Sequence, residues 1–184
     1  MSDSWEKLYS ECSSCTACEL SQTRTNCVFG AGSKNATLLF VGEAPGDNED
    51  KTGVPFIGRA GKLLNEYLAE VGIDRESVYI ANVLKCRPPK NRDPLPAEED
   101  ACISFLERQI ALLSPKLIVC LGRVSAKRLI SKKFKITSEH GAWYEFNGIP
   151  ITAVYHPALL LRDPRKKGEM LIDMQMICDR LNEL

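Results

Sequence analysis

Four continuous apolar runs recur along the chain. They are "TLLFVG" (37–42), "SVYIAN" (77–82), "KLIVCLG" (116–122) and "ITAVYH" (151–156). Each run is apolar at consecutive positions rather than at alternate ones, which is typical of strands buried on both faces of a parallel sheet. We therefore predict a mostly parallel sheet built from four strands at these positions.

Helical periodicity separates and follows these runs. It covers residues 58–72, 96–114, 125–134 and 168–184. The first of these segments ends at Gly72, a typical helix stop, and the second opens with Pro96, which favours the first helical position. The alternation of strand and helix predicts an α/β fold. Asn147–Gly148 carries the signal of a hairpin turn that leads into the last strand.

The length and composition indicate one ordinary globular unit. The chain has 184 residues, 44% of them apolar and 26% charged, so we expect a single domain over 1–184. No run approaches the ~20 apolar residues of a membrane span, and the first residues do not resemble a signal peptide. We expect a cytoplasmic protein without membrane contact, and a monomer by default.

The net charge is zero, so binding to nucleic acid would depend on local basic patches. Two patches are present, and ordinary solvated surface is the alternative interpretation of each. The first consists of Lys85, Arg87, Lys90 and Arg92, and the second of Arg162, Arg165, Lys166 and Lys167.

Polar side chains follow the predicted strands, where parallel sheets bind their ligands. Glu43 follows the first run, Asn82 and His156 end the second and the fourth, and Phe56 lies in the loop "GVPFIG". The turn after the first run carries four carboxylates, which would repel a phosphate. This set suits a planar, neutral ring with hydrogen-bonding edges. The structural alternatives are chain capping by Asn82, core packing by Phe56, a structural His-Pro step at His156 and capping of the next turn by Glu43.

Eight cysteines are many for a reducing compartment, where metal ligation or inert burial is expected instead of disulfides. The run "CSSCTAC" (12–18) has the spacing of thiolates that share one metal centre, and zinc or an iron–sulfur cluster would accept them. Cys86 and Cys102 are further candidates. We expect the others to be buried and inert, namely Cys27, Cys120 and Cys178.

Five longer motifs resemble the family-four uracil-DNA glycosylases, the iron–sulfur branch of that superfamily. They are "CTAC", "VGEAPGDNEDKTGVPFIGRAG", "ANVLKCRPPKNRDPLP", "KLIVCLG" and "YHPALLLRDP", and the likeness runs from about Cys15 to the final helix. The resemblance implies a three-layer α/β/α sandwich around a four-stranded, mostly parallel sheet. It also implies a monofunctional DNA glycosylase of base-excision repair, which hydrolyses the N-glycosidic bond of flipped-out deoxyuridine, releases uracil and leaves an abasic site.

The resemblance further implies a [4Fe–4S] cluster, with zinc as the alternative, and an N-terminal cluster-binding segment at 1–30. The four ligands fall on Cys15, Cys18, Cys86 and Cys102. This leaves Cys12 unused, although it is close enough in sequence to be an alternative ligand, and the choice rests on the resemblance alone. The uracil-binding residues carried over are Gly42, Glu43, Ala44, Glu49, Phe56, Asn82 and His156.

The same resemblance assigns roles at the bond that breaks. Phe56 would stack on uracil, Asn82 would read its edge, and His156 would lie near its O2 atom. Positive charge builds on the sugar in this reaction and negative charge on the departing base, so Glu43 and Glu49 would favour the first and His156 the second. Either glutamate could orient water. Ala44 occupies the place where another branch carries a water-positioning Asp, so no general base is carried over.

Contacts with DNA are expected from Arg87, Lys90, Leu160 and Arg162, with a leucine of 159–161 as a wedge in the duplex. Inward packing of these leucines is the alternative. A relative that traps uracil without turnover would carry a basic insertion with an extra His, and "RPPKNRDPLP" is short. A redox or nucleotide-binding protein is the other rival, but the chain lacks both a Gly-x-Gly-x-x-Gly fingerprint and a P-loop lysine.

Overall fold

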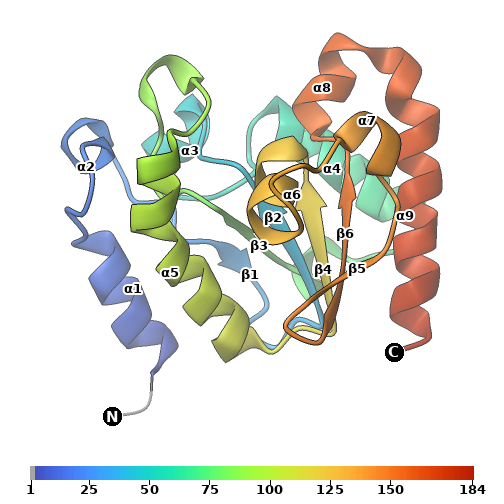
Figure 1. Cartoon of the computed structure of the whole chain (residues 1–184), viewed down its shortest axis with the longest axis horizontal. Coiled ribbons are helices and arrows are strands. Elements are labelled where there is room, and N and C mark those ends of the chain that lie inside the picture. The colour runs from blue at the N-terminus through green and yellow to red at the C-terminus, as the bar shows by residue number, and fades with distance from the viewer. Residues whose placement is uncertain (1–2) are drawn as a thin grey trace.

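A computed structural model describes residues 3–184, so the first two residues of the predicted segment 1–30 lie outside the described part. Residues 3–184 form one open sheet of six strands in the order β1-β3-β2-β4-β6-β5 (Figure 1). The strands are β1 (Ala31–Gly32), β2 (Leu38–Gly42), β3 (Tyr79–Asn82), β4 (Leu117–Leu121), β5 (Tyr144–Phe146) and β6 (Ile149–Val154).

The four predicted strands form the parallel centre of the sheet, as β3, β2, β4 and β6. The predicted strand count of four is wrong, because β1 and β5 add an antiparallel strand at each edge. β1 has two residues and is too short to show a pattern. β5 belongs to the predicted hairpin, in which Asn147 and Gly148 both adopt the positive φ angles that this two-residue turn needs.

Helices follow most of the strands. They are α1 (Trp5–Ser13), α2 (Leu20–Thr23), α3 (Asp47–Thr52), α4 (Arg59–Glu70), α5 (Pro96–Leu113), α6 (Arg123–Leu129), α7 (Ile136–Glu139), α8 (Pro157–Arg162) and α9 (Lys167–Asn182), with short 3-10 turns η1 (Arg75–Ser77), η2 (Pro89–Asn91) and η3 (Pro164–Lys166). Within residues 3–184, none has the length and apolar character that a membrane crossing would require.

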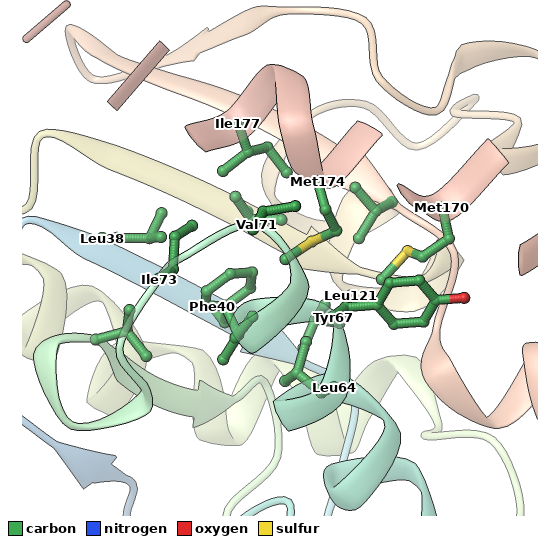
Figure 2. Packing of buried hydrophobic residues seen from close by; sticks show 14 of the residues in the cluster. Leu38, Phe40, Leu64, Tyr67, Val71, Ile73, Leu121, Met170, Met174 and Ile177 are labelled. Atoms are coloured by element: carbon green, nitrogen blue, oxygen red, sulfur yellow. The ribbon is translucent and has the colours of Figure 1, made fainter. Parts of the chain in front are cut away.

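One face of the sheet packs against α4 and α9. Phe40 of β2 lies in a cluster with Leu64 and Tyr67 of α4 and with Met170 and Met174 of α9 (Figure 2). Leu64 and Tyr67 are three residues apart in the sequence, and Met170 and Met174 are four apart, which is the spacing of one helix face. Their burial stabilises each helix on the sheet by ~25 cal/mol per Å² of apolar surface removed from water.

The opposite face packs against α5 and α6, so helices cover both faces. Val41 and Cys120 of the sheet lie with Leu106 and Ile110 of α5 and Ala126 of α6. A third cluster joins the N-terminal helices to α5, which lie side by side in Figure 1. It contains Leu8, Leu20, Phe29, Leu84 and Phe105 together with several cysteines.

Candidate functional site

Asn82 is the last residue of β3 and pairs in register with Gly42, the last residue of β2. Its side chain is 1% exposed. Asn82 Oδ1 is the one buried side-chain oxygen or nitrogen without a hydrogen-bond partner among residues 3–184. A buried acceptor of this kind costs about 1–3 kcal/mol, so its retention at a strand end indicates a ligand that supplies a donor.

Gly42 allows the side chains of Asn82 and Phe56 to approach its backbone closely. A Cβ atom at this position would lie 2.3 Å from Asn82 Oδ1 and 2.6 Å from Cε2 of Phe56. The phenyl ring and the free amide oxygen therefore meet over the same glycine. Any side chain here would displace one of them, and this explains why the strand ends in glycine.

The Phe56 loop is held in an uncommon conformation. Phe56 has a φ angle of 53°, which is costly for a bulky side chain and tends to occur at functional sites. Glu49 of α3 holds the following backbone, because its Oε1 accepts hydrogen bonds from the amides of Ile57 at 3.2 Å and Gly58 at 3.0 Å. Gly61 leaves room for the Phe56 carbonyl, which a Cβ atom would meet at 1.7 Å.

His156 lies next to Phe56, with ring centroids 5.7 Å apart. It caps α8, and its Nδ1 atom accepts a hydrogen bond from the amide of Ala158 at 3.1 Å. This bond places the proton of the neutral ring on Nε2. Burial, followed by the positive charge of Arg162, lowers the pKa of His156 to about 4. The ring is therefore a neutral donor at physiological pH.

Glu43 follows β2 and is half-buried. Burial, followed by the like charge of Asp93, raises the pKa of Glu43 to about 7, although Arg123 opposes the shift. A carboxyl group with this pKa can exchange a proton near neutrality, as a general base must. The carboxylate of Glu49 is already engaged with the backbone, and Ala44 packs beside the N-terminal cluster.

The predicted metal ligands lie around one small cavity between α1, α2, α5 and the segment after β3. Its lining includes Cys15, Cys18, Cys86 and Cys102. Nitrogen donors already point at three of the sulfurs. Arg24 Nη1 lies 3.1 Å from Cys86 Sγ, the Lys85 amide 3.3 Å from Cys102 Sγ, and the Ala17 amide 3.5 Å from Cys15 Sγ. Four thiols, three of which receive an N–H donor at sulfur, fit the ligand chemistry of an iron–sulfur cluster.

Cys12 also lines this cavity, but its sulfur has another neighbour. Cys12 Sγ lies 3.3 Å from Cys27 Sγ, so these two thiols pair with each other. Cys27 was expected to be buried and inert, and it is half-buried, as is Cys178. No three His, Cys, Asp or Glu side chains of the described chain converge closely enough to hold a single metal ion.

The basic residues predicted to contact DNA differ in exposure. Lys90 and Arg162 are exposed, whereas Arg87 is half-buried and pairs with Asp47 at 2.8 Å. Leu160 is fully buried in the core, and the exposed leucine is its neighbour Leu161 at 36%. Lys85 does not belong to a surface patch either, because it is 1% exposed.

Two structural residues escaped the sequence reasoning. Asp50 is buried, and its Oδ1 accepts hydrogen bonds from the amides of Thr25 at 2.9 Å and Asn26 at 3.3 Å. It thereby ties the acidic turn to the N-terminal segment. Arg24 donates to both Ser13 O and Cys86 Sγ. Neither residue stands in a pattern that distinguishes it from surface charge.

Comparisons with known proteins identify the family of the chain. The sequence model of the uracil DNA glycosylase superfamily matches residues 29–175. The type-4 uracil-DNA glycosylase of Archaeoglobus fulgidus is 45% identical over 183 residues, which covers 95% of this chain and 92% of the relative. The type-4 uracil-DNA glycosylase of Thermotoga maritima is 49% identical over 151 residues, with 81% and 79% covered.

A type-5 uracil-DNA glycosylase from Thermus thermophilus is more distant, at 31% identity over 175 residues, with 84% of this chain and 80% of the relative covered. The identities thus separate the two branches, and they confirm the resemblance found in the motifs. The chain belongs to the uracil DNA glycosylase superfamily and, within it, to the type-4 branch.

Proposed function

We propose that this protein removes uracil from DNA by hydrolysing the N-glycosidic bond of a flipped-out deoxyuridine, leaving an abasic site for base-excision repair. The observation that carries the proposal is the free, buried Oδ1 of Asn82 beside the rings of Phe56 and His156. The names of the type-4 relatives support the same activity.

Asn82 discriminates uracil from cytosine. Its Oδ1 accepts the N3 hydrogen of uracil, and its amide group donates to O4. Cytosine has no hydrogen at N3 and presents a donor at the exocyclic position, so both contacts are lost. Each mispaired buried group costs about 1–3 kcal/mol. Phe56 provides the apolar face on which the extruded base stacks.

His156 stabilises the departing base. The bond from the Ala158 amide to Nδ1 leaves Nε2–H available to donate to uracil O2, where negative charge develops. A preorganised donor of this kind is worth about 3–4 kcal/mol. Because the pKa of His156 is lowered to about 4, the ring stabilises the charge as a neutral hydrogen-bond donor without transferring its proton.

Glu43 acts at the sugar. Its ionised carboxylate favours the oxocarbenium character that deoxyribose acquires. The same carboxylate orients the water that attacks the sugar. Glu49 supports the site indirectly, because its Oε1 holds the Ile57 and Gly58 amides and so fixes the loop that carries Phe56. With Ala44 unable to bind water, Glu43 is the carboxylate we assign to water.

The duplex is contacted from α8 and η2. Leu161, in place of the buried Leu160, is the wedge that fills the space left by the extruded base. Arg162 at the end of α8 and Lys90 in η2 bind phosphates. Arg87 supports this surface by its ion pair with Asp47. The partner is therefore uracil-containing DNA, bound by a monomer.

We further propose that Cys15, Cys18, Cys86 and Cys102 hold a [4Fe–4S] cluster. Such a cluster would link the N-terminal segment, the loop after β3 and α5 at one point, and zinc is the alternative at the same thiols. Cys15 and Cys18 come from the N-terminal segment, Cys86 from the basic loop and Cys102 from α5. Cytoplasmic location is part of this proposal, since a reducing compartment keeps the thiols available.

An excision assay tests the activity. Oligonucleotides with a single uracil, either single-stranded or opposite G or A, are incubated with the protein and then cleaved by alkali. Strand scission at the uracil position is expected, and Asn82→Ala and His156→Ala should each slow single-turnover cleavage by about 10²-fold or more. Binding without scission would support a non-catalytic relative and exclude the glycosylase.

A further inference from the structure

Lys85 occupies an unusual place for a lysine. It is 1% exposed, between the cysteine-lined cavity and Asn82. Its Nζ atom donates to the backbone oxygen of Asn82 at 2.9 Å and to Oε1 of Gln109 at 2.6 Å. Both acceptors are uncharged. Burial of an ammonium group against neutral oxygens is costly, and an unbranched apolar side chain would fill the same space without this cost.

The bond to Asn82 fixes the peptide group that follows the base-reading side chain. Lys85 Nζ donates to the carbonyl of that peptide, which belongs to Asn82. The N–H of the same peptide belongs to Val83 and donates to Gly42 O at 3.0 Å. Asn82 cannot orient itself through Oδ1, since this oxygen must stay free for the base. The direction of its side chain therefore depends on the two bonds to its backbone.

The other contacts of Lys85 lead to the cysteines. Its amide donates to Cys102 Sγ at 3.3 Å, its carbonyl accepts from the Val28 amide at 2.7 Å, and the next residue is Cys86. Gln109 lies on the same helix as Cys102, and its Nε2 donates to Phe29 O at 2.8 Å. One residue thus joins two predicted cluster ligands to the residue that reads the base.

We propose that Lys85 is a positioning residue for base recognition, which holds the Asn82 backbone in register with the cysteine-lined cavity. The proposal rests on the proposed role of Asn82 in reading uracil. In this role the buried amino group of Lys85 sets the backbone geometry at the end of β3, where Asn82 reads the base. A residue that only fills the core would not control that geometry.

A double-mutant cycle on single-stranded DNA containing one uracil tests this. Lys85→Met, Asn82→Ala and the double variant are compared in kcat/KM. Lys85→Met should lower kcat/KM about tenfold in the native background and less than twofold in the Asn82→Ala background, because residues that act through one another are not additive. An equal loss in both backgrounds, or no loss in the native one, overturns the proposal.

Hydrogen exchange gives a readout that does not depend on activity. In Lys85→Met the amide of Val83 should exchange faster, while iron content per chain stays unchanged; unchanged exchange contradicts the proposal. Thr152→Val is the matched control, since Thr152 is also 1% exposed and its hydroxyl donates to Ala142 O on the far side of the sheet. It should leave kcat/KM and the exchange of Val83 unaltered.

If Lys85→Met loses iron, a second variant tests the same proposal without changing a residue next to a cysteine. Gln109→Leu removes the other acceptor of Lys85 and leaves the cysteines and Asn82 intact. It should lower kcat/KM about threefold in the native background alone, and an equal loss in the Asn82→Ala background overturns the proposal. If Asn82→Ala itself cleaves normally, the proposed base recognition fails, which is distinguishable from failure of the Lys85 inference.

Discussion

At the scale of single residues, Gly42 allows Asn82 and Phe56, the groups proposed to bind the base, to approach each other closely. Gly42→Ala places a methyl group 2.3 Å from Asn82 Oδ1 and 2.6 Å from the Phe56 ring. We expect cleavage to fall by about 10²-fold, because a displacement of this size at a reacting centre costs about that much. Gly168→Ala is the control, since a Cβ there meets nothing within 4 Å. Normal single-turnover rates for Gly42→Ala would contradict the assignment.

Glu43 gives the reaction its expected pH dependence. With its pKa raised to about 7, the ionised form is lost as the pH falls, so the single-turnover rate should decline below about pH 7. Glu43→Gln should be slower at pH 8 and show no such decline. His156, neutral above about pH 4, adds no inflection in this range. A wild-type profile that is flat from pH 5 to 8 would exclude Glu43.

The same group affects stability with a defined sign. The folded-state pKa of Glu43 exceeds its unfolded value, so its contribution is full at low pH and is lost as the pH rises through about 7. Glu43→Gln should therefore stabilise the protein at pH 8 by on the order of 2 kcal/mol, and by less at pH 5. Urea unfolding at both pH values measures this difference.

The sequence predicted which candidate site residues lie at strand ends, whereas their roles stay predictions. Asn82 and His156 were predicted because the carboxyl ends of parallel strands meet at one edge. Lys85 was assigned to the surface, because its burial depends on Gln109, a residue 24 positions away. The choice between Leu160 and Leu161 depends on the orientation of a six-residue helix, which is too short for its periodicity to be read.

At the scale of elements, α8 places a buried leucine, Leu160, beside an exposed one, Leu161, which is the proposed wedge. Leu161→Ala should lower kcat/KM on duplex DNA about tenfold and leave single-stranded DNA unaffected, because a wedge matters only where a base must leave a stack. Leu160→Ala should instead destabilise the fold by about 2–5 kcal/mol. Equal losses of activity on both substrates with Leu161→Ala would refute the wedge.

The segment after α1 carries two of the four cysteines that we propose as cluster ligands, Cys15 and Cys18. Cys15→Ser should abolish iron binding, whereas Cys12→Ser and Cys27→Ser should retain it, since these two thiols pair with each other. Iron content per chain and absorbance near ~400 nm are the measurements. Iron that survives Cys15→Ser but not Cys12→Ser would reverse the ligand assignment.

At the scale of the whole molecule, the continuous apolar runs predicted the parallel centre of the sheet because both of its faces are covered by helices. The two edge strands were not among the four predicted strands, because they are too short to leave a pattern of buried positions in the sequence. β1 has two residues and β5 has three, and segments so short bury too little to leave a periodic pattern. The α/β fold was therefore predictable, while the number of strands was not.

The short edges have a consequence for the behaviour of the protein at high concentration. An unpaired strand margin can recruit the margin of a second molecule and begin a cross-β fibre. Here each margin of the sheet ends in a strand of at most three residues, too brief a template for such growth. Self-association through the sheet is thereby suppressed without any charged or proline residue being needed within β1.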